Sequence, residues 1–202
     1  YDSIRVNRLA LDVNAKGKSL SSVLSVRSVV RDSLGIFGLT LTNTAKVGAL
    51  ESTLRVQNGE IPPSYVLSAQ LERAGGVSTL HIVPDGLVLD SKPWTADPEN
   101  LLRFTDRGLK AEHFDLRSEA QRLQVVTDEI GTRIDVEKFR FGTLLNFVTS
   151  QDSTEFATGE LNGHMQLPGN GAAGGMAANI QVKGLELLGN ALGDLAIKAD
   201  ET

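Results

Sequence analysis

The chain of 202 residues contains no cysteine, only 5% aromatic residues, and no apolar run approaching the roughly 20 residues that a membrane-spanning helix needs. The lack of cysteine excludes a disulfide framework and a thiolate metal site. Lys and Arg are not clustered and the net charge is -5, which disfavours binding to the phosphate backbone of a nucleic acid. We therefore expect no nucleic-acid partner.

Motifs of catalytic chemistry are missing as well. Nucleophile-elbow, P-loop and zincin patterns are absent, and His81, His113 and His164 lie far apart without a second ligand at metal-binding spacing. One dinucleotide-type match, GNGAAG at 169–174, runs into an alternating segment, whereas the phosphate-binding version opens a helix. We interpret this match as a flexible hairpin loop, and we expect no enzyme, no cofactor and no metal.

The segment 92–123 carries the clearest structural pattern. Trp94 stands between Pro93 and Pro98, which lack a backbone N–H and favour extended neighbours, so a helix is excluded there. Leu102 and Phe104 then alternate with polar residues, as in a strand with one buried face. The alternation moves by one residue between Ala111 and Phe114, and this shift predicts a β-bulge.

Most other segments alternate in the same way and are separated by short turn sequences rich in Gly, Pro and Asn. Residues 4–13 alternate apart from a slip near Arg8, which predicts one bulged strand or two short ones. Residues 20–34 fit either a strand or a helical stripe, and we favour the strand. Leu144, Leu145 and Val148 have helical spacing, so we expect one short helix at 143–149 with Thr143 as its N-cap.

The pattern therefore predicts an all-β antiparallel meander, and the composition suggests how its apolar face is used. Aromatic residues are few for filling a closed core, so we expect a trough lined with aliphatic side chains and suited to acyl chains. Burial of about ten methylene groups would contribute on the order of 8 kcal/mol. The predicted lining comprises Leu54, Val56, Leu67, Leu71, Leu80, Ile82, Leu87, Leu89, Leu102, Phe104, Phe114, Leu116, Leu123, Val125, Ile134, Val136, Leu161, Met165, Leu167, Ile180, Val182, Leu195 and Ile197.

The run LHIVPDGLVLDSKPWTADPENLLRFTDRGLKAEHFDLRSEAQRLQV at 80–125 resembles the C-terminal region of the TamB family (translocation and assembly module subunit TamB), particularly its Bacteroidota-like branch. Later segments are similar too, including DVEKF at 135–139, GELNG at 159–163 and LGDLAI at 192–197. The resemblance implies an elongated sheet folded lengthwise into a greasy trough, called a β-taco. It also implies a periplasmic location, an inner-membrane anchor outside this segment, and a TamA-like outer-membrane barrel as partner.

We thus interpret 1–202 as a single elongated β-trough segment of a longer chain, because strand patterns run to both of its ends. The leading hypothesis is a non-enzymatic segment of a periplasm-spanning TamB-like protein that carries phospholipid acyl chains and supports outer-membrane biogenesis. A second is a chaperone-like scaffold that assembles outer-membrane proteins or autotransporters by pairing with their strands. A third is a structural β adhesin with a dry core.

Overall fold

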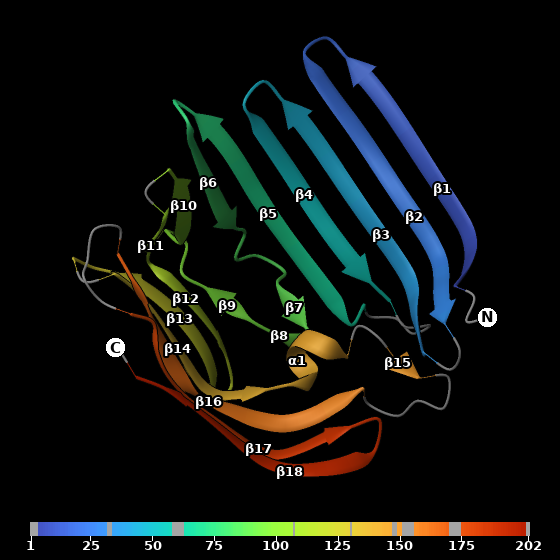
Figure 1. The fold of residues 1–202 in the computed structure, drawn as a ribbon. Coiled ribbons are helices and arrows are strands. Elements are labelled where there is room, and N and C mark those ends of the chain that lie inside the picture. The colour runs from blue at the N-terminus through green and yellow to red at the C-terminus, as the bar shows by residue number, and fades with distance from the viewer. Residues whose placement is uncertain are drawn as a thin grey trace.

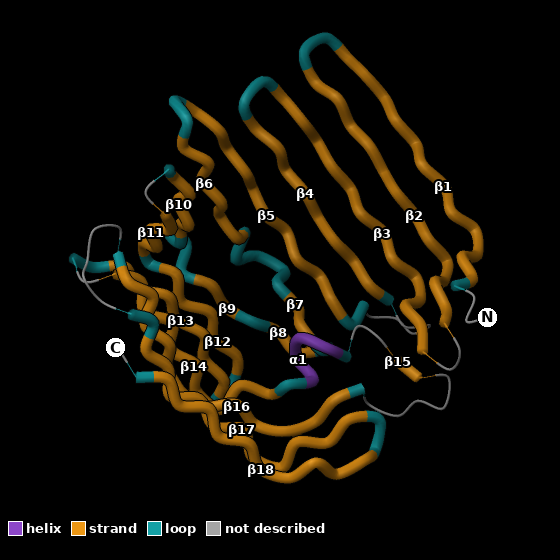
Figure 2. Tube along the Cα trace, in the orientation of Figure 1, coloured by secondary structure: helices purple, strands orange, loops and turns teal. Residues whose placement is uncertain are grey.

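The structure, a computed structural model, describes residues 4–31, 34–57, 63–106, 108–129, 131–146, 149–150, 156–169 and 175–200. Figure 2 shows that nearly all of this chain is strand, with one short helical turn. Among the residues described, no helix is long and apolar enough to cross a membrane. The strands form two antiparallel sheets, named sheet A and sheet B below.

Sheet A contains eleven strands within the described residues, and its main path runs β1-β2-β3-β4-β5-β6-β10-β11. Two-residue turns such as Gly17-Lys18 and Gly75-Gly76 connect its long hairpins, and their glycines supply the positive φ that such turns require. The strands are β1 (Arg5–Lys16), β2 (Ser19–Arg31), β3 (Leu34–Lys46), β4 (Ala49–Val56), β5 (Tyr65–Ala74), β6 (Val77–Ile82), β7 (Val88–Leu89), β8 (Lys92–Pro93), β10 (Leu101–Thr105), β11 (Gly108–Glu112) and β15 (Thr149–Ser150).

Sheet B contains seven strands in the order β18-β17-β16-β14-β13-β12-β9, again counting described residues. Four register irregularities interrupt its ladders, including one between Val136 and Phe139. The strands are β9 (Thr95–Ala96), β12 (Phe114–Ser118), β13 (Gln121–Thr127), β14 (Gly131–Arg140), β16 (Ala157–Pro168), β17 (Ala177–Leu187) and β18 (Asn190–Ala199).

The chain passes from sheet A to sheet B at Trp94, returns to sheet A between β9 and β10, and passes to sheet B again at His113. Trp94 separates β8 of sheet A from β9 of sheet B, and His113, with φ +50°, separates β11 of sheet A from β12 of sheet B. The sequence predicted a β-bulge from the one-residue shift between Ala111 and Phe114, and this prediction is wrong. The shift is a change of sheet, which alters the direction of the next inward side chain in the same way.

The predictions for the first strands are largely confirmed. Residues 20–34 contain β2, so the strand interpretation is correct and the helical one is wrong. Residues 5–13 belong to one strand, β1, which begins one residue later than predicted, and Arg8 has φ +48° where the slip was expected. The pairing of Asn7 with Ser28 and of Leu9 with Val26 keeps one register across Arg8, so the irregularity does not shift the ladder.

The predicted helix exists but is shorter than expected. Helix α1 spans Gly142–Leu145, and Thr149 already belongs to β15; residues 147 and 148 lie outside the described residues. Thr143 is not the N-cap. The helix begins one residue earlier, at Gly142, so the N-cap position is Phe141, which makes no side-chain cap hydrogen bond. The hydroxyl of the buried Thr143 donates to Oε1 of Gln121 at 3.0 Å.

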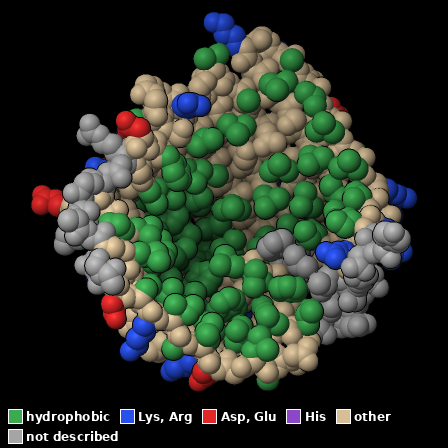
Figure 3. All heavy atoms as spheres, viewed as in Figure 1, with side chains coloured by type: hydrophobic (Ala, Val, Ile, Leu, Met, Phe, Trp, Pro, Cys, Tyr) green, Lys and Arg blue, Asp and Glu red, His purple; other side chains and the backbone are tan. Residues whose placement is uncertain are grey.

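The two sheets meet along β10 and β11 of sheet A and β12 and β13 of sheet B, while β1 and β18 lie at the far edges (Figure 1). Hydrogen bonds hold the two sheets together at this meeting line. The Ala111 N–H donates to the Thr127 hydroxyl at 2.8 Å, and the Thr132 hydroxyl donates to the Leu109 carbonyl at 3.1 Å. Figure 3 shows a hollow lined with hydrophobic side chains between the sheets. The prediction of an all-β antiparallel trough is confirmed.

Candidate functional site

The strand register aligns apolar side chains into rows across the inner face of sheet A. One row, called the leucine row below, joins β1 to β5, and neighbouring members are direct cross-strand partners. A second row runs beside it. The leucine row is Leu11, Leu24, Leu41, Leu54 and Leu67, and the second row is Leu9, Val26, Leu39, Val56 and Tyr65.

These rows face sheet B on their β5 side, where Leu67 packs against the core between the sheets. Toward β1 the leucine row becomes exposed, because no described strand of sheet B lies opposite it. Leu11 is 65% exposed, whereas Val56, on the neighbouring row, is only 2% exposed. The inner face of sheet A is therefore closed near sheet B and at Val26 and Val56 of the second row. It is more open along the leucine row and beyond it over β1 to β4, a region called the open wing below.

A row of polar side chains crosses the apolar surface of the open wing. Ser22, Asn43 and Ser52 are cross-strand partners on β2, β3 and β4, and they share the inner face with the leucine row two residues away. The Ser52 hydroxyl donates to Oδ1 of Asn43 at 2.6 Å, and Nδ2 of Asn43 donates to Oγ of Ser22 at 3.3 Å. These three residues are called the polar row below.

Sheet B presents a matching apolar face. Phe139, Leu161, Val182 and Leu195 form one row across β14, β16, β17 and β18. A shallow cavity of about 80 Å³ opens between β14, β16 and β17, and its apolar lining includes Ile134, Val136, Leu161, Met165 and Ile180. Gly163 also lines this cavity, and its φ of +144° is one that residues with a Cβ rarely adopt.

A compact core closes the line along which the sheets meet, and it is called the junction core below. Trp94 is 3% exposed and its ring centroid lies 5.5 Å from that of Phe139, with the rings tilted by 53°. This geometry is favourable for an aromatic pair. The junction core consists of Ile82, Leu87, Trp94, Ala96, Ala111, Phe114, Leu116, Val125 and Phe139.

Asn100 locks the backbone beside this core. Its side chain is fully buried, at 0% exposure, and makes both possible hydrogen bonds to the main chain of Ile82, each at 2.8 Å. Its Nδ2 also donates to the Asp97 carbonyl at 2.6 Å. One asparagine side chain thereby forms hydrogen bonds with backbone groups at the end of β6 and in the turn before β10.

The predicted lining residues fall into three groups of exposure. Buried are Val56, Ile82, Leu87, Phe114, Leu116, Val125 and Val182. Half-buried are Leu54, Leu67, Leu80, Leu89, Leu102, Leu123, Ile134, Val136, Leu161, Met165, Leu167 and Ile180. Exposed are Leu71, Phe104, Leu195 and Ile197. Five of the buried residues belong to the junction core. Eight of the half-buried residues pack against that core, namely Leu67, Leu80, Leu89, Leu102, Leu123, Ile134, Val136 and Leu161, so most of the predicted lining lies in the packed part of the trough.

The sequence-based list missed much of the open wing. Leu11, Leu24, Leu39 and Leu41 lie on the inner rows but were not among the predicted lining residues. The alternation of Leu39 with Leu41 was a sufficient signal for β3. In β1 the slip at Arg8 concealed which residues share a face, and only the pairing with β2 resolves it.

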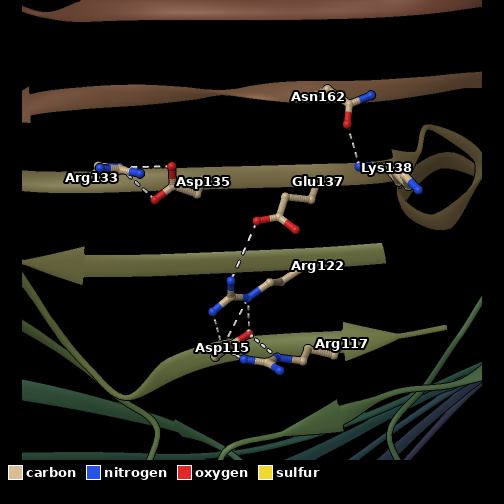
Figure 4. A network of polar contacts seen from close by, with 8 residues as sticks. All are labelled: Asp115, Arg117, Arg122, Arg133, Asp135, Glu137, Lys138 and Asn162. Carbon is tan, nitrogen blue, oxygen red and sulfur yellow. Dashed lines mark hydrogen bonds and ion pairs between the residues drawn. The ribbon is translucent and has the colours of Figure 1, made fainter. Parts of the chain in front are cut away.

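The outer face of sheet B carries a network of charges (Figure 4). The Asp115 carboxylate accepts hydrogen bonds from Arg117 at 2.6 Å and from Arg122 at 2.7 Å, and Arg122 also lies 3.6 Å from Glu137. The hydrogen bonds from Arg117, followed by those from Arg122, hold the pKa of the Asp115 carboxyl well below its ordinary value of 3.8. Sheet B is thus apolar inside and ion-paired outside.

The remaining predictions from the sequence concern a metal site and the dinucleotide-type match. Within the part of the chain that the structure describes, no three His, Asp or Glu side chains gather as a metal site. Residues 170–174 of the dinucleotide-type match lie outside the described residues, and the segment that follows is strand β17, not a helix. A scan against protein-family models and searches of curated proteins and of solved structures found no match to this chain.

Proposed function

We propose that the trough carries the acyl chains of phospholipids, and that the chain acts as a non-enzymatic conduit segment. The supporting observation is the set of apolar rows that continue from the junction core into the open wing. Five adjacent strands spaced by about 4.8 Å give the leucine row a length of roughly 19 Å. One leaflet of a bilayer core is about 15 Å thick, so an acyl chain can lie along the row.

The wider role follows from the resemblance to the TamB family. In this proposal the chain belongs to a periplasm-spanning protein whose inner-membrane anchor lies outside the segment and which meets a TamA-like outer-membrane barrel. The open trough is the feature that such a role requires, since a lipid must enter and leave from the side. Affinity then comes from methylene burial, at roughly 0.8 kcal/mol for each group, without directional contacts that would hold the lipid in place.

Leu41→Asp tests this function, with Thr42→Asp as the matched control. The two positions are neighbours on β3, and alternation places Leu41 on the inner face and Thr42 on the outer face. We expect Leu41→Asp to reduce binding of a fluorescent phospholipid by at least about tenfold, and Thr42→Asp to leave it unchanged, with both variants folded by circular dichroism. Equal binding by the two folded variants would contradict the proposal.

Strand β1 favours a second candidate, a scaffold that pairs with strands of other proteins. All twelve residues of β1 are exposed, the strand contains no proline, and β2 is its only partner among the described strands. Long unprotected edges readily accept another strand. Ala10→Pro should abolish capture of an unfolded outer-membrane protein while phospholipid binding persists. Unchanged capture would rule out this edge as the scaffold.

A further inference from the structure

The polar row has no evident structural need at its position in the open wing. It lies about 7 Å from the leucine row on one side. On the other side, at the same spacing, lies an apolar row that includes Leu20, Ala45 and Leu50. Ser22, Asn43 and Ser52 are half-buried, so their side chains border the hollow and are not sealed in a core. A polar strip within an apolar wall would place a hydrogen-bonding group of the ligand at a defined level.

The hydrogen bonds within the polar row leave two donors unused. Asn43 donates one amide N–H to Ser22 and accepts from Ser52. Among the described residues, neither the second Asn43 N–H nor the Ser22 hydroxyl hydrogen has an acceptor. A ligand group that accepts hydrogen bonds would therefore complete the row.

The surroundings limit the chemistry of that group. The leucine row and the row of Leu20, Ala45 and Leu50 contain no Lys or Arg on β2, β3 or β4, so the site lacks the positive charge that a phosphate or a free carboxylate would need when partly buried. A neutral carbonyl oxygen fits both the unused donors and the absence of charge.

We propose that the polar row binds the ester carbonyls of a lipid whose acyl chains lie along the leucine row. This inference rests on the proposed function and names the part of the lipid that the site selects. The row is a specificity element: methylene burial supplies the affinity, and Asn43 with Ser22 distinguishes an esterified chain from a hydrocarbon chain that lacks carbonyls. The same hydrogen bonds fix how far along the strands the lipid's backbone sits.

A comparison of two synthetic lipids tests the proposal. The probes are a short-chain diester phosphatidylcholine and its diether analogue of equal chain length, both presented as monomers and measured by calorimetry. We expect the natural protein to bind the diester about fivefold more tightly, the effect of one net hydrogen bond. Asn43→Leu, a change of similar volume, should abolish this preference and leave binding of the diether equal or tighter. Thr44→Val, on the opposite face of β3, should retain the preference.

Each outcome separates this inference from the proposed function. The proposed role of the polar row is wrong if the natural protein and Asn43→Leu prefer the diester over the diether equally. It is also wrong if the natural protein shows no preference for the diester. Binding of neither lipid by the natural protein overturns the conduit function itself. If Asn43→Leu does not fold, Ser22→Ala serves as a second variant, and an undiminished diester preference in that variant also overturns the inference.

Discussion

The junction core and the open wing are built from the same alternating pattern but differ in what lies opposite them. At the junction, Trp94 and Phe139 face each other from the sheet crossing and β14, and both are almost fully buried. In the open wing, Leu9 and Leu11 occupy equivalent inward positions and are about two-thirds exposed, at 64% and 65%. An alternating strand therefore specifies a face to be covered, and a second sheet within packing distance decides whether that face is a core or a groove.

Aromatic residues separate the two regions further. The junction holds the only tryptophan together with Phe114 and Phe139. Strands β1 to β4 contain one aromatic residue, Phe37 of β3, and the rows described above consist there of Leu, Val and Ala with the polar row. Large rings fill the narrow space where the sheets converge, and short aliphatic side chains leave room where they diverge. The low aromatic content is thus consistent with a molecule in which side chains fill the space between the sheets only at the junction core.

The largest expected effect comes from truncating the centre of the junction core. Trp94→Ala should lower the free energy of unfolding by about 3 to 5 kcal/mol, because it removes the packing of the indole and leaves a cavity. The matched change in the open wing, Leu11→Ala, should cost less than about 0.5 kcal/mol. Urea denaturation followed by circular dichroism measures both. Similar losses in the two variants would mean that the open wing is packed like the junction.

Two asparagines provide the next comparison. Asn100→Leu should cost about 2 to 4 kcal/mol, because it leaves the buried N–H and carbonyl of Ile82 without partners. Asn43→Leu should cost less than about 1 kcal/mol, since its neighbours border the hollow. Differential scanning calorimetry of the two variants measures the contrast. An Asn43→Leu variant as unstable as Asn100→Leu would make the polar row a structural element.

The smallest effect concerns the charges on the outer face of sheet B. Because the pKa of Asp115 is lowered in the folded state, its ion pairs contribute stability above pH 3.8, and this contribution is lost as the pH falls further. Asp115→Asn should lower the free energy of unfolding by about 1 kcal/mol at pH 7 and by progressively less below pH 4. Urea midpoints across this pH range measure the difference.

Asp12→Asn on the exposed strand β1 is the control for this last experiment, since Asp12 has no ion pair among the described residues. We expect its urea midpoint to match that of the natural protein at pH 7. A cost for Asp115→Asn that stays constant down to pH 3 would show that its ion pairs do not account for the effect.

Local patterns made the strands predictable. Alternation, glycine turns and the prolines around Trp94 identified most elements, including β2 in an ambiguous segment, because each signal depends on residues close together in the chain. The same local patterns led to two wrong predictions: a β-bulge before Phe114 and Thr143 as the N-cap of the helix. The first arose because β12 joins another sheet, and in the second the Thr143 side chain bonds to Gln121, 22 residues away.

The sequence by itself determined that this chain is an antiparallel β protein with one apolar and one polar face, because side-chain alternation and turn chemistry are local. Only the tertiary structure decided where that apolar face is closed and where it is open. That division depends on the crossings at Trp94 and His113, which bring two sheets together along one line and let them diverge elsewhere. It depends equally on strand register, which aligns Leu11 with Leu67 across five strands and sets Asn43 between apolar rows.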